Sequence, residues 1–206
     1  MAIRKRRDER EAFLRHELVV EEKVDGANLG ISFDAGGNIR AQNRGTYLHL
    51  PGSGQWKHLE GWLAPKTDHF FEHLTDRYIL FGEWCYAKHS VLYDQLPDWF
   101  LAFDIYDKHF GRFLSVNRRD RLLRLLQTAQ TPFLARGHFT LPGLIHLLAQ
   151  SKLSHQPAEG LYVRIDDGDW LSQRAKLVRP AFIQTMEHHW ARRAMIPNRL
   201  KGRGPN

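Results

Sequence analysis

Residues 17–33 read ELVVEEKVDGANLGISF, and their pattern of apolar and polar residues is the strongest indication of the fold. A strand leads up to Lys23, the chain turns at Asp25-Gly26, and apolar residues alternate with polar ones from Ala27 to Phe33. A period of two is typical of a strand with one buried face. The turn sequence at 35–38, AGGN, then predicts a hairpin back along the same sheet. The sequence therefore predicts a meander of antiparallel strands.

The rest of the chain alternates irregularly between short strands and helices. Apolar residues at mixed spacings of three and four from Trp56 to Leu74, interrupted by Pro65, predict two helical pieces. Thr140 and Pro142 start another helix. Strands are expected at 78–85, 99–106, 161–165 and 171–178, and further helices at 122–126 and 181–194. Because regular βαβ alternation is lacking, we predict an α+β fold with mostly antiparallel sheets and flanking helices.

Composition indicates one globular domain. The chain has 206 residues, of which 42% are hydrophobic, and these values exclude a disordered or collagen-like chain. Cys85 is the only cysteine, so an internal disulfide is impossible, and this usage fits a reducing compartment. We read Cys85 as a small buried hydrophobe. No run approaches the roughly 20 apolar residues of a membrane span, so we expect a cytoplasmic protein without membrane contact.

The charge balance suggests a polyanionic partner. Thirty Lys and Arg oppose 23 Asp and Glu, which gives a net charge of +7 with histidine neutral. Such a balance favours nucleic acid, because Lys and Arg that neutralise phosphates release counterions. Simple solubility is the alternative explanation. Basic residues gather at 1–12 and 195–206, two termini that could grip a nucleic acid or be flexible tails.

Lys23 is the first candidate for chemistry. It ends an apolar strand just before the Asp25-Gly26 turn, so a rigid element holds its amine at the rim of a sheet. An amine that is desolvated or flanked by cations loses its proton more readily and becomes a nucleophile. The pattern Lys-x-Asp-Gly is short, however, and a surface lysine before a turn would look the same.

Two later strands carry unusual side chains. Glu83 interrupts the apolar run Leu-Phe-Gly-Glu-Trp, and such a carboxylate must face solvent or meet a cation or ligand, since an unpaired buried charge is costly. Glu83 is therefore a candidate ligand for a ribose hydroxyl or a metal-bound water. Phe103, in Phe-Asp-Ile-Tyr, could offer its ring to a planar base, although an aromatic residue in a strand is more often part of the core.

The last two motifs are Glu-Gly-Leu-Tyr-Val and Arg-Ala-Lys-Leu-Val. Glu159 precedes a strand, and Gly160 permits close approach of the backbone. Arg174 and Lys176 project from one face of a strand, a spacing suited to adjacent phosphates. Between the first and second motifs, Arg44 ends the first hairpin, and we expect it beside the strand that bears Lys23.

The order of these motifs resembles that of the nick-sealing ATP-dependent RNA ligases, members of the covalent nucleotidyltransferase superfamily. The resemblance runs from Glu17 to Pro180. It implies an adenylyltransferase domain and a reaction in three steps. Lys23 attacks the α-phosphate of ATP to form lysyl-AMP, AMP passes to a 5′-phosphate, and a 3′-hydroxyl displaces it to seal the strand.

The resemblance also implies a role for each site residue. Glu22 and the adjoining backbone read adenine, and Phe103 stacks on it. Glu83 binds the ribose, and Arg44 grips the phosphate of the incoming 5′ end. The catalytic set implied is Lys23, Lys176 and Glu159, where Glu159 holds Mg²⁺ or Mn²⁺ and Lys176 contacts the α-phosphate and disfavours protonation of Lys23. The residues implied for the nucleotide are Glu22, Lys23, Asn28, Arg44, Glu83, Phe103, Glu159, Arg174 and Lys176.

The sequence departs from the family pattern in two ways. The last motif carries Arg174 where the family commonly has lysine, and arginine keeps the charge but cannot titrate. The stretch after Pro180 is too short for the OB-fold domain of DNA ligases and capping enzymes. We therefore expect a single nucleotidyltransferase domain over 1–206, with its core at 17–180 and without an OB domain. A partner protein or a second copy could replace the missing clamp.

Three alternatives to an RNA ligase stay open. The substrate could be a DNA nick or RNA opposite DNA, because the 2′-hydroxyl is sensed by local geometry rather than by a readable motif. The chain could be a catalytically inactive nucleic-acid-binding module of the same fold. It could also adenylylate an end or a small molecule and stop there. The charged positions expected of the site, Lys23, Glu83, Glu159 and Lys176, are all present and favour an enzyme.

Overall fold

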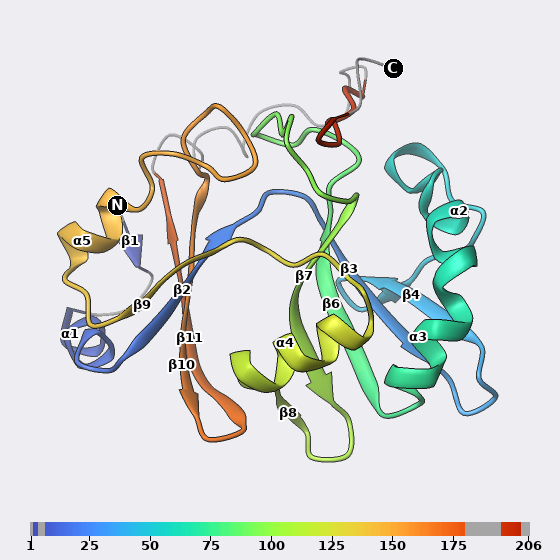
Figure 1. Cartoon of the computed structure of the whole chain (residues 1–206), viewed down its shortest axis with the longest axis horizontal. Helices are drawn as coiled ribbons and strands as arrows, with labels where there is room; N and C mark the ends of the chain where they lie inside the picture. The colour runs from blue at the N-terminus through green and yellow to red at the C-terminus, as the bar shows by residue number, and fades with distance from the viewer. Residues whose placement is uncertain (1, 4–6, 180–194, 203–206) are drawn as a thin grey trace.

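The computed structural model describes residues 2–3, 7–179 and 195–202, and within them eleven strands form two antiparallel sheets (Figure 1). The first sheet has the order β1-β11-β10-β2-β9, with β1 (Ala2–Ile3), β2 (Leu18–Lys23), β9 (Phe133–Gly137), β10 (Gly160–Asp167) and β11 (Trp170–Val178). The second has the order β5-β4-β3-β6-β7-β8, with β3 (Ala27–Phe33), β4 (Ile39–Asn43), β5 (Thr46–Tyr47), β6 (Tyr78–Trp84), β7 (Phe100–Asp107) and β8 (Arg112–Phe113). The prediction of an α+β fold with antiparallel sheets is confirmed.

Helices cover the outer face of each sheet. In Figure 1, α1 (Arg7–Leu14) and α5 (Leu141–His146) lie beside the first sheet, and α2 (Leu59–Leu63) and α3 (Thr67–Leu74) lie beside the second. Short 3₁₀ turns at Gly54–Trp56 and Ala64–Lys66 flank α2, and α4 (Val116–Leu125) packs against the core of the second sheet. The two helical pieces expected on either side of Pro65 are confirmed, as is the start of α5 at Thr140, whose hydroxyl accepts from Gly143 N.

Each sheet has its own core because its strands alternate. Leu29 and Ile31 of β3 pack with Phe70 and Leu74 of α3. The first sheet buries another apolar cluster under α1 and α5. A third cluster joins the loops after β6 to Val24, next to Lys23. The remaining face of β3 is left for polar residues and glycine, and it is on this side that the chemistry gathers.

The junction between the sheets lies at the turn after Lys23. β2 and β3 follow one another in the chain but belong to different sheets, so the turn at 24–26 carries the chain from one sheet to the other. Lys23 therefore stands where residues of both sheets can reach it. The position of Arg44 differs from our expectation that it would lie beside the strand of Lys23. It follows β4, which pairs with β3 and β5, whereas β2, the strand of Lys23, pairs with β10 and β9.

The structure describes parts of the two basic termini predicted at 1–12 and 195–206. Residues 7–14 form α1, and residues 195–202 bond to the loops after β6. The helix expected at 181–194, with His188 and His189, lies outside the described residues. Among the described helices, none is long and apolar enough to cross a bilayer.

Candidate active site

Lys23 is held at the end of β2 by a carboxylate from the neighbouring strand. Its Nζ donates to both oxygens of Glu159, at 2.7 and 2.6 Å. Gly160 faces Lys23 across the β2–β10 ladder. A Cβ on Gly160 would lie 2.5 Å from the Leu177 carbonyl oxygen and 3.3 Å from Lys23 Cδ. The glycine after Glu159 is therefore required so that β11 and the lysine stem can pack closely.

β11 adds two cations to the same side of the sheet. Lys176 pairs with Tyr162 across the β10–β11 ladder, and partial burial together with the positive charge of Lys23 lowers the pKa of Lys176. Arg174 lies two residues away. Its guanidinium donates to Asp104 Oδ2 at 2.8 Å and to the Tyr162 hydroxyl at 3.1 Å, and it covers the ring of Phe113. Arg174 is thus already engaged by protein groups, whereas Lys176 is the freer cation.

The second sheet contributes Glu83 from β6. Asn28 lies directly opposite Glu83 on β3, so both side chains share one face. Burial raises the pKa of Glu83 to about 8, and Lys23 and Lys176 offset part of this effect. Its Oε2 is buried without a hydrogen-bond partner among the described residues. A protonated carboxyl with a free oxygen is ready to exchange hydrogen bonds with a hydroxyl group.

These residues form what we call the junction cluster: Lys23, Asp25, Glu83, Glu159 and Lys176. Its members come from both sheets and act electrostatically on one another. Burial also raises the pKa of Glu159, although the Lys23 ammonium opposes this shift. Four of the predicted site residues are therefore brought together, and Asp25 joins them.

The turn after Lys23 is fixed by a loop that the sequence did not single out. Tyr93 is fully buried, and its hydroxyl accepts a 2.8 Å hydrogen bond from Asp25 N. Asp25 Oδ2 accepts from Ser90 N at 2.6 Å. Tyr93 lies in an irregular segment without a periodic pattern, so no local signal marked its role.

Glu22 is placed away from the junction cluster. Its side chain points to the other face of β2, because successive residues of a strand alternate. There it is buried and accepts from the Ser151 hydroxyl and from Lys152 N, the latter at 2.8 Å. Burial raises its pKa. The reading of adenine by Glu22 stays a prediction. The backbone of Glu22, unlike its side chain, lies beside Lys23 in the β2–β10 ladder.

Phe103 and Arg44 lie at the margins of the cluster. Phe103 is half-buried, and its ring centroid is 6.1 Å from that of Tyr162. Arg44 is exposed just past the end of β4, with a positive φ of 46°. The charges of Arg44, Lys23 and Asp25 all act on His89, so Arg44 approaches the cluster from the second sheet. Burial lowers the pKa of His89.

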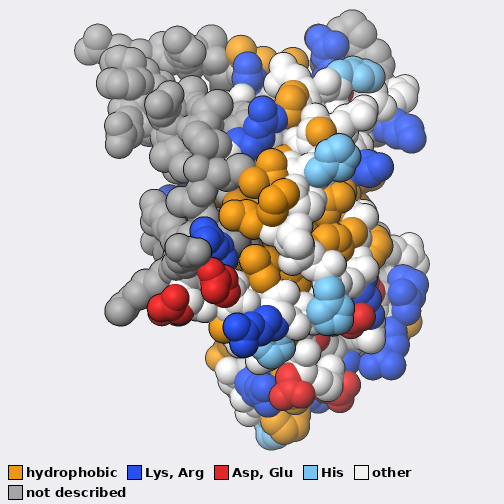
Figure 2. All heavy atoms as spheres, turned by 90° about the vertical axis from the view of Figure 1, so that its left-hand side faces the viewer, with side chains coloured by type: hydrophobic (Ala, Val, Ile, Leu, Met, Phe, Trp, Pro, Cys, Tyr) orange, Lys and Arg blue, Asp and Glu red, His pale blue; other side chains and the backbone are white. Residues whose placement is uncertain are grey.

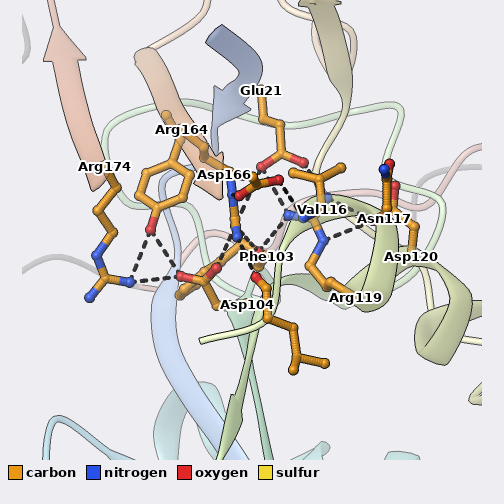
Figure 3. Close-up of polar contacts among 12 residues, drawn as sticks. Glu21, Phe103, Asp104, Val116, Asn117, Arg119, Asp120, Arg164, Asp166 and Arg174 are labelled. Atoms are coloured by element: carbon orange, nitrogen blue, oxygen red, sulfur yellow. Dashed lines mark hydrogen bonds and ion pairs between the residues drawn. The ribbon is translucent and has the colours of Figure 1, made fainter. Parts of the chain in front are cut away.

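A buried polar network lies behind Phe103 and was not anticipated (Figure 3). Arg119 of α4 and Arg164 of β10 both donate to the Phe103 carbonyl, at 2.7 and 3.0 Å. Asp104 binds Arg164 and Arg174. Arg119 belongs to no motif, and its partner Glu21 is distant in the chain, so no local pattern could reveal it.

Carboxylate oxygens in the junction cluster fit a hard divalent cation. Glu159 offers two oxygens at the side of Lys23, and oxygen donors of this kind suit Mg²⁺ or Mn²⁺. A separate group of His69, Glu72 and His73 lies on α3, on the outer layer of the second sheet. Cys85 is buried, and burial raises its pKa well above the ordinary value, which agrees with a core role.

The two-sheet fold, with a lysine at the junction and carboxylates and a second lysine around it, defines a nucleotidyltransferase domain. The family model described as RNA ligase matches residues 16–178. The chain belongs to the RNA ligase family. No curated protein matches it by sequence.

Solved structures of a Naegleria gruberi RNA ligase share the fold. A Glu-to-Ala mutant with AMP and Mn superposes with a TM-score of 0.67 at 20% identity, covering 86% of this chain and 53% of that chain. A Lys-to-Met mutant with AMP and Mn gives 0.66 at 18% identity, covering 88% and 54%. The ligase with PPi gives 0.64 at 19% identity, covering 84% and 52%. The chain therefore spans about half the length of the solved proteins that it matches.

Proposed function

We propose that this protein is an ATP-dependent RNA ligase that works through a lysyl-AMP intermediate on Lys23. The observation that carries the proposal is the convergence of Lys23, Glu159 and Lys176 from the first sheet with Glu83 from the second. Family membership and solved relatives with AMP and Mn or with PPi support the same assignment. A binding module that had lost catalysis would have no need for this set of charged groups.

The first step transfers AMP to Lys23. The Lys23 ammonium must first leave its ion pair with Glu159 and release a proton to solvent. The Nζ lone pair then attacks the α-phosphate, and a second Nζ proton is released to solvent as the bond forms. A bond forms between Nζ and phosphorus, the bond from phosphorus to the bridging oxygen breaks, and pyrophosphate leaves with that electron pair. Lys176 would neutralise charge that develops on the α-phosphate. A divalent cation bound by Glu159 would supply further charge neutralisation there.

The nucleoside would lie between the junction cluster and the second sheet. Phe103 offers a ring for stacking on the base, and Asn28 and Glu83 share a face suited to the ribose. At neutral pH Glu83 retains its proton, because its pKa is raised to about 8, so it can both donate to and accept from a ribose hydroxyl. Arg174 would contribute positive charge beside the phosphates while it stays bound to Asp104.

In the second step AMP passes from Lys23 to a 5′-phosphate, and in the third a 3′-hydroxyl attacks that phosphate and AMP leaves. We assign Arg44 to the 5′-phosphate, since its guanidinium is exposed at the edge of the site.

The substrate is proposed to be RNA, in the form of a nicked duplex, and DNA-containing nicks are the nearest alternative. Comparing nicks with a ribose or a deoxyribose on the 3′ side distinguishes the two. A partner protein or a second copy is proposed to complete the grip on the duplex, and the proposed compartment is the cytoplasm.

The experiment that tests this function measures transfer of labelled AMP to the protein. The purified chain is incubated with ATP labelled at the α-phosphate and with Mg²⁺ or Mn²⁺, and the product is examined by denaturing gel and intact mass. We expect a covalent AMP adduct on the wild type and none on Lys23→Ala. Lys108→Ala removes an exposed lysine in the turn after β7 and should label like the wild type.

Joining of a pre-adenylylated 5′ end separates the later chemistry from the first step. Lys23→Ala should retain this joining, because the end already carries AMP and no attack by Lys23 on ATP is required. ATP-dependent ligation by Lys23→Ala at the wild-type rate would contradict the proposal. Absence of an adduct on the folded wild type, after treatment with pyrophosphate to remove resident AMP, would favour the inactive binding module.

A further inference from the structure

The carbonyl of Phe103 is freed from the sheet by a β-bulge. Across the β6–β7 ladder Gly82 pairs with Ala102 and Phe81 pairs with Asp104, so Phe103 is the extra residue of β7. A bulge leaves its extra residue unpaired and redirects its side chain. A buried carbonyl without a partner costs free energy, so the structure must satisfy it in another way.

Two guanidinium groups take the place of the missing ladder partner. Arg119 Nη1 donates to the Phe103 carbonyl oxygen at 2.7 Å, and Arg164 Nη1 donates to it at 3.0 Å. Figure 3 shows both side chains reaching this carbonyl from different elements, Arg119 from α4 and Arg164 from β10. Their side chains are only 1% and 0% exposed. Two fully buried cations on one carbonyl are an expensive arrangement unless each is also paired.

The other donors of Arg119 connect it to the strand of the nucleophile. Its Nη1 donates to Glu21 Oε2 at 3.0 Å, its Nη2 donates to Glu21 Oε1, and its Nε donates to Asp120 at 2.8 Å. Glu21 lies two residues before Lys23 on β2, and the two side chains share a face. One guanidinium therefore joins the Lys23 strand of the first sheet to the Phe103 backbone of the second.

Arg164 makes the same connection from β10. Its Nη1 also donates to Asp104, the residue after Phe103, and its Nη2 donates to the Leu114 carbonyl at 3.0 Å. Arg164, a residue of the first sheet, thus binds Phe103 and Asp104 of β7 and Leu114 in the segment before α4. Forked guanidinium groups fix direction as well as distance.

We infer that Arg119 and Arg164 are positioning residues that set the Phe103 ring against the nucleotide site at a fixed place relative to Lys23. This inference rests on the proposed function. Stability alone does not require such a pair, because buried ion pairs can often be replaced by apolar side chains of similar volume without loss. An apolar replacement, however, cannot donate to the Phe103 carbonyl. The two roles can therefore be separated by experiment.

The test compares Glu21→Met/Arg119→Met with Arg119→Lys. The double variant removes both charges of the Arg119–Glu21 pair together, so neither is left unpaired. Asp120, whose side chain is 26% exposed, loses its bond to Arg119, and the Phe103 carbonyl loses one donor. Arg119→Lys keeps the charge against Glu21 and loses the fork. Arg121→Met, which removes an exposed arginine from the same helix, is the matched control.

The measurements are the half-saturating ATP concentration and the limiting rate of AMP transfer to Lys23, together with the midpoint of thermal unfolding. We expect Glu21→Met/Arg119→Met and Arg119→Lys each to raise the half-saturating ATP concentration by about tenfold, which is the scale of one lost base-stacking contact. The limiting rate should change by less than about threefold, as for a loss of uniform binding. The thermal midpoint of the double variant should stay near that of the wild type, and Arg121→Met should match the wild type in every measurement.

Combination with Phe103→Ala decides whether Arg119 acts through Phe103. If it does, Phe103→Ala should raise the half-saturating ATP concentration strongly in the wild type but by less than about twofold in the double variant, since coupled residues are not additive. The inference is overturned if Glu21→Met/Arg119→Met and Arg119→Lys both have the half-saturating ATP concentration of the wild type. It is also overturned if Phe103→Ala raises that concentration equally in the wild type and in the double variant. If the double variant does not fold, Arg119→Lys alone decides. Failure of the wild type to accept AMP would count against the proposed function instead.

Discussion

Glu83 combines an energetic cost of burial with the role that we propose for it at the ribose. It is a carboxyl group in an apolar strand, and burial raises its pKa from the ordinary 4.5 to about 8. A group whose pKa is higher in the folded than in the unfolded state binds more protons when folded. Its contribution to stability is fully present below about pH 4.5 and is lost as the pH rises through about 8.

Glu83→Gln should therefore flatten the pH dependence of stability. Between pH 5 and pH 8 we expect the wild type to lose free energy of unfolding on the order of a few kcal/mol relative to Glu83→Gln, because glutamine keeps the shape of the protonated acid and does not ionise. Urea unfolding at several pH values measures this difference. Glu22, whose pKa is also raised but which lies on the other face of β2, contributes equally in both proteins and cancels in the comparison.

Parallel curves for the two proteins would contradict the raised pKa of Glu83. Glu60→Gln removes an exposed carboxylate at the edge of α2 and controls for the change in net charge. AMP transfer by Glu83→Gln adds a second measurement. Retained nucleotide binding would indicate that the ribose needs a neutral hydrogen-bonding group rather than a charge.

Sequence and structure agree best where the chemistry is local to one strand. Lys23, Glu159 and Lys176 were recognisable because each occupies a defined position in a short motif. Arg119 and Arg164 were not assigned a role, because their partners lie 98 and 60 residues away in the chain. A long-range ion pair leaves no periodic signal in a single sequence. The particular roles of the motif residues stay predictions until they are tested.

At the scale of elements, the segment 195–202 fastens the loops beside the site. Asn198 is 3% exposed, and its amide accepts from Tyr93 N at 2.9 Å and donates to the carbonyls of Cys85 and Ala87 at 2.7 and 3.2 Å. The sequence predicted a basic terminus at 195–206 that could either grip a nucleic acid or be a flexible tail. Short polar segments look alike in sequence whether or not a buried asparagine anchors them.

Asn198→Ala should destabilise the protein by about 2 to 4 kcal/mol, because it leaves three buried backbone groups without partners. Urea unfolding measures the change. The loss should extend to the site, since Tyr93 fixes the turn after Lys23 through Asp25. We expect slower AMP transfer by Asn198→Ala even under conditions in which it is fully folded.

Arg199→Ala provides the matched control for this segment. Arg199 is exposed, and its backbone bonds to Tyr93 and Leu96 survive the substitution. Its stability should stay within about 0.5 kcal/mol of the wild type. Equal stability of Asn198→Ala and Arg199→Ala would show that the segment does not hold the loops.

Strands and helices themselves were largely predictable, and their partners were not. The alternation in β3 and the break at Pro65 both act within a few residues, so sequence patterns report them. Arg44 was placed beside the Lys23 strand because β2 and β3 are consecutive in the chain. The turn at 24–26 instead carries the chain into a second sheet, and only tertiary packing decides that change.

For the whole molecule, the net charge of +7 raises the question of where on the surface the basic side chains lie. Figure 2 views the side that carries α1 and α5 in Figure 1. In the described part of this face, hydrophobic side chains gather in the middle, and Lys and Arg lie scattered around them together with acidic groups. The cations assigned to phosphate are instead at the junction of the sheets and, for Arg44, in the turn just after β4. Net charge thus supports a polyanionic partner, whereas only the site indicates where it binds.

Arg44 allows this assignment to be tested through the salt dependence of RNA binding. Each phosphate contact contributes roughly −0.7 to −0.9 to the slope of log affinity against log salt concentration. If Arg44 grips the 5′-phosphate at a nick, Arg44→Ala should reduce the magnitude of that slope by about one. Fluorescence anisotropy with a nicked RNA duplex, without ATP or divalent metal to prevent turnover, measures the slope.

Arg40→Ala is the matched control, because Arg40 is an exposed arginine of β4, close in the chain to Arg44, and already pairs with Asp34 at 2.6 Å. Its removal should leave the slope close to the wild-type value, since an arginine already paired with a carboxylate is not expected to contact phosphate. Equal slopes for all three proteins would remove Arg44 from the phosphate site. A smaller slope for both variants would mean that β4 contributes only diffuse positive charge, and that the 5′-phosphate is held by the cations on β11.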